Sequence, residues 1–94
     1  MPTESQLRDP VLRAAIRQRI DAGRLPVMIP KRISAGYGTE SRCDACEQPI
    51  TRKQVEYDID DVPYGAPLSL HLGCHVLWQI ECVERMRAAM ADAR

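Results

Sequence analysis

Apolar residues near the start of the chain recur at the spacing of one helical face. Leu12, Ile16 and Ile20 lie four residues apart, with Val11 and Ala15 beside them and basic or amide side chains between. This period is typical of an amphipathic helix. Because an isolated helix of this length is only marginally stable in water, we expect its apolar face to pack against the rest of the chain.

The ends of this helix are marked by capping residues. Asp9 followed by Pro10 is typical of an N-cap and a first helical residue, and Gly23 can adopt the left-handed conformation that ends a helix. We therefore predict a helix over residues 10–22, within an N-terminal segment 1–24.

Residues 25–40 are predicted to form an extended connector and a loop. Pro26 and Pro30 exclude a helix or a central strand over this first stretch. The following residues, 34–39, contain two glycines and a serine, a composition that favours a flexible loop.

Two later segments alternate between apolar and polar residues, which is the period of a half-buried strand. In residues 54–60 the apolar positions are Val55, Tyr57 and Ile59, and acidic residues occupy the other face, which we expect to be solvated. A leucine stands at every second position from 68 to 72, and two prolines and a glycine separate the two segments. The pair is predicted to form a β-hairpin.

The C-terminal part of the chain has a second helical pattern. Residues 74–91 contain no Pro or Gly, and their apolar side chains recur at helical spacing. The order helix, connector, hairpin and helix predicts an α+β fold with a single domain over residues 1–94. Residues 41–94, which include the hairpin and the second helix, are predicted to form one module of this domain.

The core of this domain is expected to be small. The chain has 94 residues, no Phe, one Trp and three Tyr. A protein of this length buries only about 60–65% of the surface of its unfolded chain, so we expect a further source of stability. The four cysteines suggest one, either as disulfides or as metal ligands.

The cellular compartment decides between these two roles. Arginines interrupt every apolar stretch near the N-terminus, and no run of about 18 apolar residues occurs. We therefore expect a cytoplasmic protein with reduced thiols and no membrane segment, for which metal binding is favoured over disulfides.

Four residues have the spacing of a zinc site. Cys43 and Cys46 form one pair and His71 and Cys74 another, each with two intervening residues, and 24 residues separate the pairs. Zinc takes four sulfur or nitrogen ligands at tetrahedral corners, and two local pairs around a folded insert supply them. We predict one structural Zn²⁺ on these four residues.

Other readings of the cysteines and histidines stay open. The first cysteine pair can serve as a redox pair, although a proline and a hairpin follow it instead of the helix that such a pair requires. His75 or Cys82 can replace His71 as the fourth ligand. His75 points about 100° away from Cys74 on a helix, and Cys82 is expected to be buried among apolar side chains.

The ligand order resembles a known architecture. A knuckle with Cys43 and Cys46, a β-hairpin, and His71 and Cys74 at the start of a helix look like a treble-clef zinc finger. The Cys-Cys-His-Cys order is similar to that of the first zinc module of LIM domains and of poly(ADP-ribose) polymerase fingers. The resemblance implies zinc ligation by these four residues only. The wider pattern, which includes Ile-Arg-Gln-Arg-Ile, Gly-Arg-Leu-Pro and Pro-Ile-Thr, is similar to small bacterial proteins without an assigned activity.

A closed zinc shell leaves no position for substrate, so we expect no enzymatic activity and no catalytic residues. The favoured function is a protein–protein interaction or regulatory module, which uses the N-terminal helix or the connector to bind another protein. The alternative is a nucleic-acid-binding finger, which zero net charge and expected exposure of Glu81 and Glu84 disfavour. Its basic surface would consist of Arg13, Arg17, Arg19, Lys31, Arg32, Arg42, Arg52 and Lys53.

Overall fold

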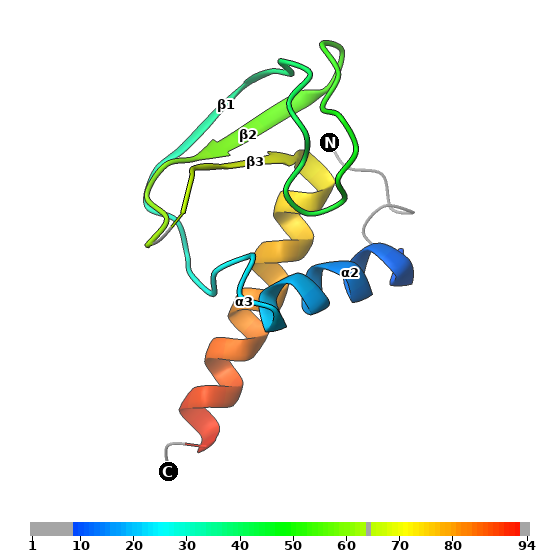
Figure 1. Ribbon diagram of the computed structural model, residues 1–94. Helices are drawn as coiled ribbons and strands as arrows, with labels where there is room; N and C mark the ends of the chain where they lie inside the picture. Colours follow the sequence, from blue (N-terminus) through cyan, green and yellow to red (C-terminus); the bar gives the residue numbers. More distant parts are fainter. Residues whose placement is uncertain (1–8, 64, 93–94) are drawn as a thin grey trace.

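The computed structural model describes residues 9–63 and 65–92, and in these residues it has two helices and one antiparallel sheet of three strands. The elements follow one another as α2 (Pro10–Asp21), β1 (Ile33–Tyr37), β2 (Val55–Ile59), β3 (Leu68–His71) and α3 (Leu72–Asp92) (Figure 1). The predicted α+β class is confirmed. The first eight residues of the predicted segment 1–24 lie outside the described residues.

Helix α2 begins and ends at the predicted caps. The Asp9 carboxylate accepts hydrogen bonds from the backbone N–H of Val11 at 3.0 Å and of Leu12 at 3.2 Å. Gly23 has a φ of 76°, the left-handed conformation expected after the C-terminus of the helix. The helix ends at Asp21, one residue before the predicted boundary.

The loop predicted over residues 34–39 is wrong, because most of it belongs to strand β1. This strand pairs with β2 along its whole length, so that Ile33 faces Ile59 and Tyr37 faces Val55. All five of its residues are exposed, and its Ser-Ala-Gly sequence has little intrinsic preference for a strand. Backbone hydrogen bonds to the edge of β2 therefore determine the extended conformation of β1.

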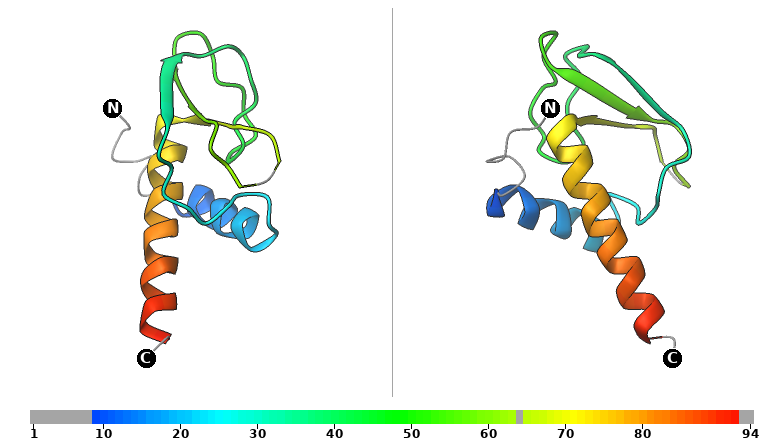
Figure 2. Two further views of the ribbon diagram at one scale, coloured as in Figure 1. Left: turned by 90° about the vertical axis from the view of Figure 1, so that its left-hand side faces the viewer. Right: turned by 180° about the vertical axis from the view of Figure 1, so that it is seen from behind.

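The predicted hairpin of β2 and β3 is confirmed. The sheet order is β1-β2-β3, and His71 of β3 lies opposite Glu56 of β2. Helix α3 follows β3 without a connecting residue. The sheet lies beside the N-terminal turns of α3, α2 crosses the middle of α3, and the C-terminal turns of α3 project beyond the rest of the molecule (Figures 1 and 2).

Helix α2 packs against its own chain, as its amphipathic pattern predicts. Ile16 is fully buried and Ile20 nearly so, and both belong to one core with Leu77 and Trp78 of α3. The connector closes this core, because the Trp78 indole N–H donates to the carbonyl of Pro26 at 2.9 Å. The apolar face of α2 is thus already covered within the chain.

The burial of β2 differs from the alternation prediction at its first two residues, whereas Ile59 is buried as predicted. Val55 is 41% exposed, whereas Glu56 is only 4% exposed. The Glu56 carboxylate accepts hydrogen bonds from the Thr39 backbone N–H at 3.1 Å and the Thr39 hydroxyl at 2.9 Å. The chain after β1 therefore covers Glu56, and satisfied hydrogen bonds compensate for the burial of its carboxylate.

The predicted exposure of Glu81 is also wrong. Its side chain is 5% exposed and accepts hydrogen bonds from Arg17 at 2.8 Å and Arg13 at 3.4 Å. These contacts join α2 to α3. Glu84, one turn further along α3, has a side chain that is 55% exposed, in agreement with the prediction.

In the part of the chain that the structure describes, no helix has the length and apolar character needed to cross a bilayer.

Candidate metal centre

The first two candidate ligands lie on a tight turn, which we call the knuckle (residues 41–50). The Cys43 backbone N–H donates to the Gln48 carbonyl and the Glu47 N–H donates to the Cys43 carbonyl, both at 2.9 Å. Glu47 has a φ of 66°, a left-handed conformation that reverses the chain directly after Cys46. The two sulfurs are therefore fixed on one side of the knuckle.

The knuckle is attached to the outer edge of strand β3. The Asp44 N–H donates to the Ser69 carbonyl at 2.9 Å, and the Ser69 N–H donates to the Asp44 carboxylate at 2.7 Å. Ser69 lies two residues before His71 on the same strand. This attachment brings the end of β3 to the cysteine pair.

The second pair comes from the junction between β3 and α3. His71 is the last residue of the strand, and Cys74 lies in the first turn of the helix. Residues three apart at such a helix start lie on the same side, so both side chains turn toward the knuckle.

The four predicted ligands converge on one point. The ligand atoms of Cys43, Cys46, His71 and Cys74 all lie within 4.8 Å of one another. His71 Nδ1 is 3.3 Å from Cys46 Sγ and 4.0 Å from Cys74 Sγ. Three sulfurs and one imidazole nitrogen are a donor set for borderline or soft cations. The cluster can therefore hold one metal ion.

The imidazole of His71 is oriented for ligation through Nδ1. Its Nε2 lies 3.2 Å from the carbonyl oxygen of Pro49 and 3.1 Å from Gln54 Oε1, and both are acceptors. These two acceptors favour the tautomer with the proton on Nε2, in which the lone pair of Nδ1 faces the sulfurs. The sequence pattern gave no indication of this support by Pro49 and Gln54.

The three thiols differ in their tendency to ionise. Hydrogen bonds from the Cys46 and Cys74 thiols hold the pKa of Cys43 well below its usual range. The same contact with Cys43 raises the pKa of Cys46 and Cys74. A metal cation compensates for the repulsion that three adjacent thiolates would otherwise experience.

The two alternative fourth ligands lie outside this cluster. The His75 ring stacks on Tyr57 with 5.0 Å between ring centroids, and burial lowers the pKa of His75. Cys82 is fully buried in the core, with its sulfur 3.6 Å from the Pro26 carbonyl. The apolar role expected for Cys82 is confirmed.

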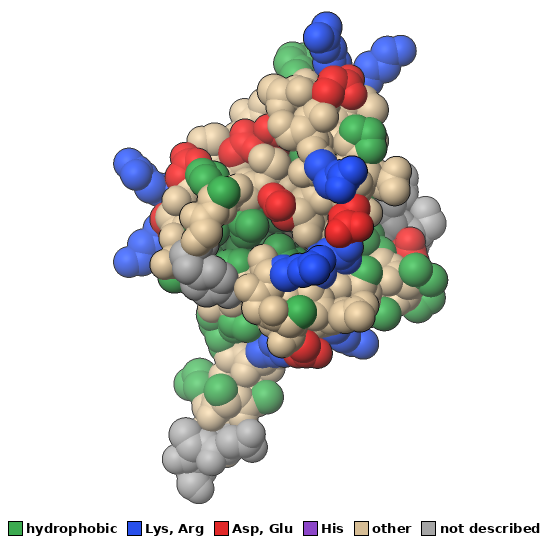
Figure 3. All heavy atoms as spheres, viewed as in Figure 1, with side chains coloured by type: hydrophobic (Ala, Val, Ile, Leu, Met, Phe, Trp, Pro, Cys, Tyr) green, Lys and Arg blue, Asp and Glu red, His purple; other side chains and the backbone are tan. Residues whose placement is uncertain are grey.

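Three of the eight basic residues of the alternative site are paired with carboxylates. Arg13 and Arg17 contact Glu81, and Arg19 contacts Glu47 at 3.0 Å. The remaining five lie near the start of β1 or near the knuckle, namely Lys31, Arg32, Arg42, Arg52 and Lys53. Figure 3 shows Lys and Arg side chains in separate groups on one face, with Asp and Glu side chains beside them.

Comparisons with protein-family models, with curated proteins and with solved structures find no match for this chain. The likeness to treble-clef fingers therefore stays a prediction from ligand order and spacing. The structural support for metal binding is the convergence of the four ligand atoms.

Proposed function

We propose that this chain is a small structural-zinc protein whose treble-clef-type module binds another protein. The observation that carries the zinc part of the proposal is the Cys43, Cys46, His71 and Cys74 cluster, whose ligand atoms lie within 4.8 Å of one another. Zinc is the metal that such a set most commonly holds in proteins, as a tetrahedral site.

The proposed role of the zinc is structural and not catalytic. Four protein ligands fill its tetrahedral shell, whereas a catalytic zinc keeps one position open for water or substrate. Each ligand pair belongs to a different part of the module, the knuckle on one side and the junction of β3 with α3 on the other. The metal would therefore join two segments that are distant in the sequence.

The proposed binding surface is a shallow groove on the side of α3 that the core does not use, here called the outer α3 face. It has a volume of about 400 Å³. Its lining consists of His75, Val76, Gln79, Ile80, Val83, Glu84 and Arg87. Ile80 is 38% exposed and Val83 37% exposed. Apolar residues with a polar and charged rim are typical of protein interfaces.

Two features of α2 support this choice. One favours α3 as the binding surface, and the other favours a protein over nucleic acid as the partner. Because the apolar face of α2 is buried within the chain, we place the proposed protein contact on α3 instead of on this helix. Arg13, Arg17 and Arg19 are engaged by carboxylates, which reduces the positive charge available to phosphates.

A photo-crosslinking experiment tests the proposal. A benzophenone amino acid at position 83 of the zinc-loaded protein is expected to give one discrete protein adduct in the native cells, and the same group at the exposed position 53 is expected to give none. Adding Ile80→Glu should remove the adduct without changing zinc content, because it places a charge in the apolar groove.

Two results would contradict this function. One is the absence of any adduct specific to position 83. The other is submicromolar DNA or RNA binding at moderate salt that weakens when Arg32 or Lys53 is replaced, which would favour the nucleic-acid alternative.

A further inference from the structure

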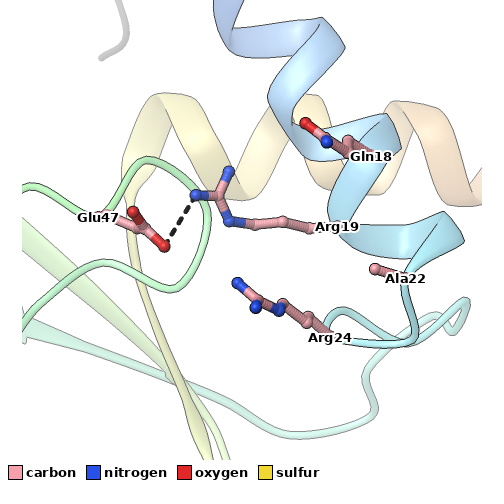
Figure 4. A pocket seen from close by; sticks show the side chains of 5 residues that line it. All are labelled: Gln18, Arg19, Ala22, Arg24 and Glu47. Atoms are coloured by element: carbon pink, nitrogen blue, oxygen red, sulfur yellow. Dashed lines mark ion pairs between the residues drawn. The ribbon is translucent and has the colours of Figure 1, made fainter.

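A polar cavity of about 370 Å³ lies between the C-terminal end of α2 and the knuckle. Figure 4 shows the side chains around it, and its lining consists of Gln18, Arg19, Ala22, Arg24 and Glu47. Its volume is within the range of small-ligand sites. The cavity is separate from both the metal cluster and the outer α3 face.

Two guanidinium groups share this cavity with one carboxylate. In Figure 4 the side chains of Arg19 and Arg24 point toward the same space, and Glu47 faces Arg19 across it. Arg19 contacts the Glu47 carboxylate at 3.0 Å, and its side chain is only 17% exposed. Arg24 has no ion-pair partner within residues 9–63 and 65–92. The three charged groups leave one positive charge uncompensated.

We propose that this cavity binds a phosphate group through Arg19 and Arg24, with the Gln18 amide as a further donor. Each planar guanidinium can donate two parallel hydrogen bonds to a pair of oxygens. Two guanidinium groups are best satisfied by three or four oxygens, which a phosphate provides and a single carboxylate does not. A dianion also removes the repulsion between two cations that share one space.

The cavity depends on the knuckle, because Glu47 directly follows the candidate ligand Cys46 and has the positive φ of the turn. The knuckle therefore positions one wall of the cavity relative to α2. The titrations are therefore made on the zinc-loaded protein with all 94 residues.

Titration with inorganic phosphate, followed by ¹H–¹⁵N NMR at constant ionic strength, tests the proposal. We expect saturable shifts confined to residues 18–24 and to Glu47, with a dissociation constant on the order of 1 mM. Chloride at the same ionic strength is expected to produce no such shifts. Equal responses to phosphate and chloride, or shifts that never saturate, would overturn the proposal.

Two substitutions with the same change of charge locate the site. Arg24→Gln is expected to weaken phosphate binding roughly tenfold, which corresponds to the loss of one hydrogen-bonded charge. Arg52 does not line the cavity, so Arg52→Gln is expected to leave phosphate binding unchanged. Equal effects of both variants would show non-specific attraction only and would refute the site.

A third variant tests the internal carboxylate. Glu47→Gln is expected to tighten phosphate binding about fivefold, because it removes a negative charge that competes for Arg19. Weaker binding by a Glu47→Gln protein that keeps its zinc would contradict the proposed geometry.

The source of the phosphate is distinguished by a second ligand, N-acetyl-phosphoserine amide. Tighter binding of this compound than of inorganic phosphate would indicate a phosphorylated protein, and weaker binding a small free phosphate; both outcomes support the site. No saturable binding of either compound would overturn it. Because the variants leave the outer α3 face unchanged, this result is independent of the crosslinking test.

Discussion

Replacement of Cys46 by serine is expected to abolish tight zinc binding and to unfold most of the protein at 25 °C. Structural zinc contributes on the order of 10 kcal/mol of apparent binding energy to small domains. The whole stability of a domain is about 5–15 kcal/mol, so most of it would be lost with the metal. Circular dichroism and zinc content of the purified variant measure the two effects.

Cys82→Ser is the matched control for this substitution. Cys82 is more deeply buried than Cys46, but it lies outside the metal cluster. The variant should keep its zinc and lose only about 1–3 kcal/mol of unfolding free energy, because a buried hydroxyl replaces a thiol. Loss of zinc in Cys82→Ser with retention in Cys46→Ser would reverse the ligand assignment.

Ile16→Ala is expected to lower the free energy of unfolding by about 2–5 kcal/mol. Ile16 is fully buried between α2 and α3, so the shorter side chain removes packing contacts and leaves a cavity. Urea denaturation of the zinc-loaded protein, with constant zinc in the buffer, gives the change directly.

Val11→Ala provides the comparison on the same helix. Val11 is 77% exposed, and its substitution is expected to change stability by less than about 0.5 kcal/mol. If Ile16→Ala has an equally small effect, α2 does not contribute to the core in solution, and its docking on α3 is wrong.

The sequence was informative where a short local pattern determines the structure. Asp9 and Gly23 act within one helical turn, and the four-residue period of Ile16 and Ile20 reports which face of α2 is buried. The metal cluster is a similar case at longer range. Each pair of ligands has a short spacing and forms locally. Only the approach of the two pairs to one another depends on the fold.

The errors arise where a distant segment determines the environment of a residue. Glu56 is buried because Thr39 covers that face of the sheet, and Glu81 because two arginines of α2 reach it. Neither contact leaves a periodic signal in the sequence. Strand β1 is a further example, since its central Ser-Ala-Gly sequence has little preference for a strand and its partner β2 lies about twenty residues away. The support of His71 by Pro49 and Gln54 was undetectable for the same reason.

Native mass spectrometry with metal analysis tests the central claim most directly. Protein purified without added metal and without chelator is expected to carry one zinc per chain, and removal of the zinc by a chelator should unfold it cooperatively. The free thiols of the denatured protein should then number four, in agreement with the four free cysteines of the structure. A protein that is fully folded and free of metal would contradict the account.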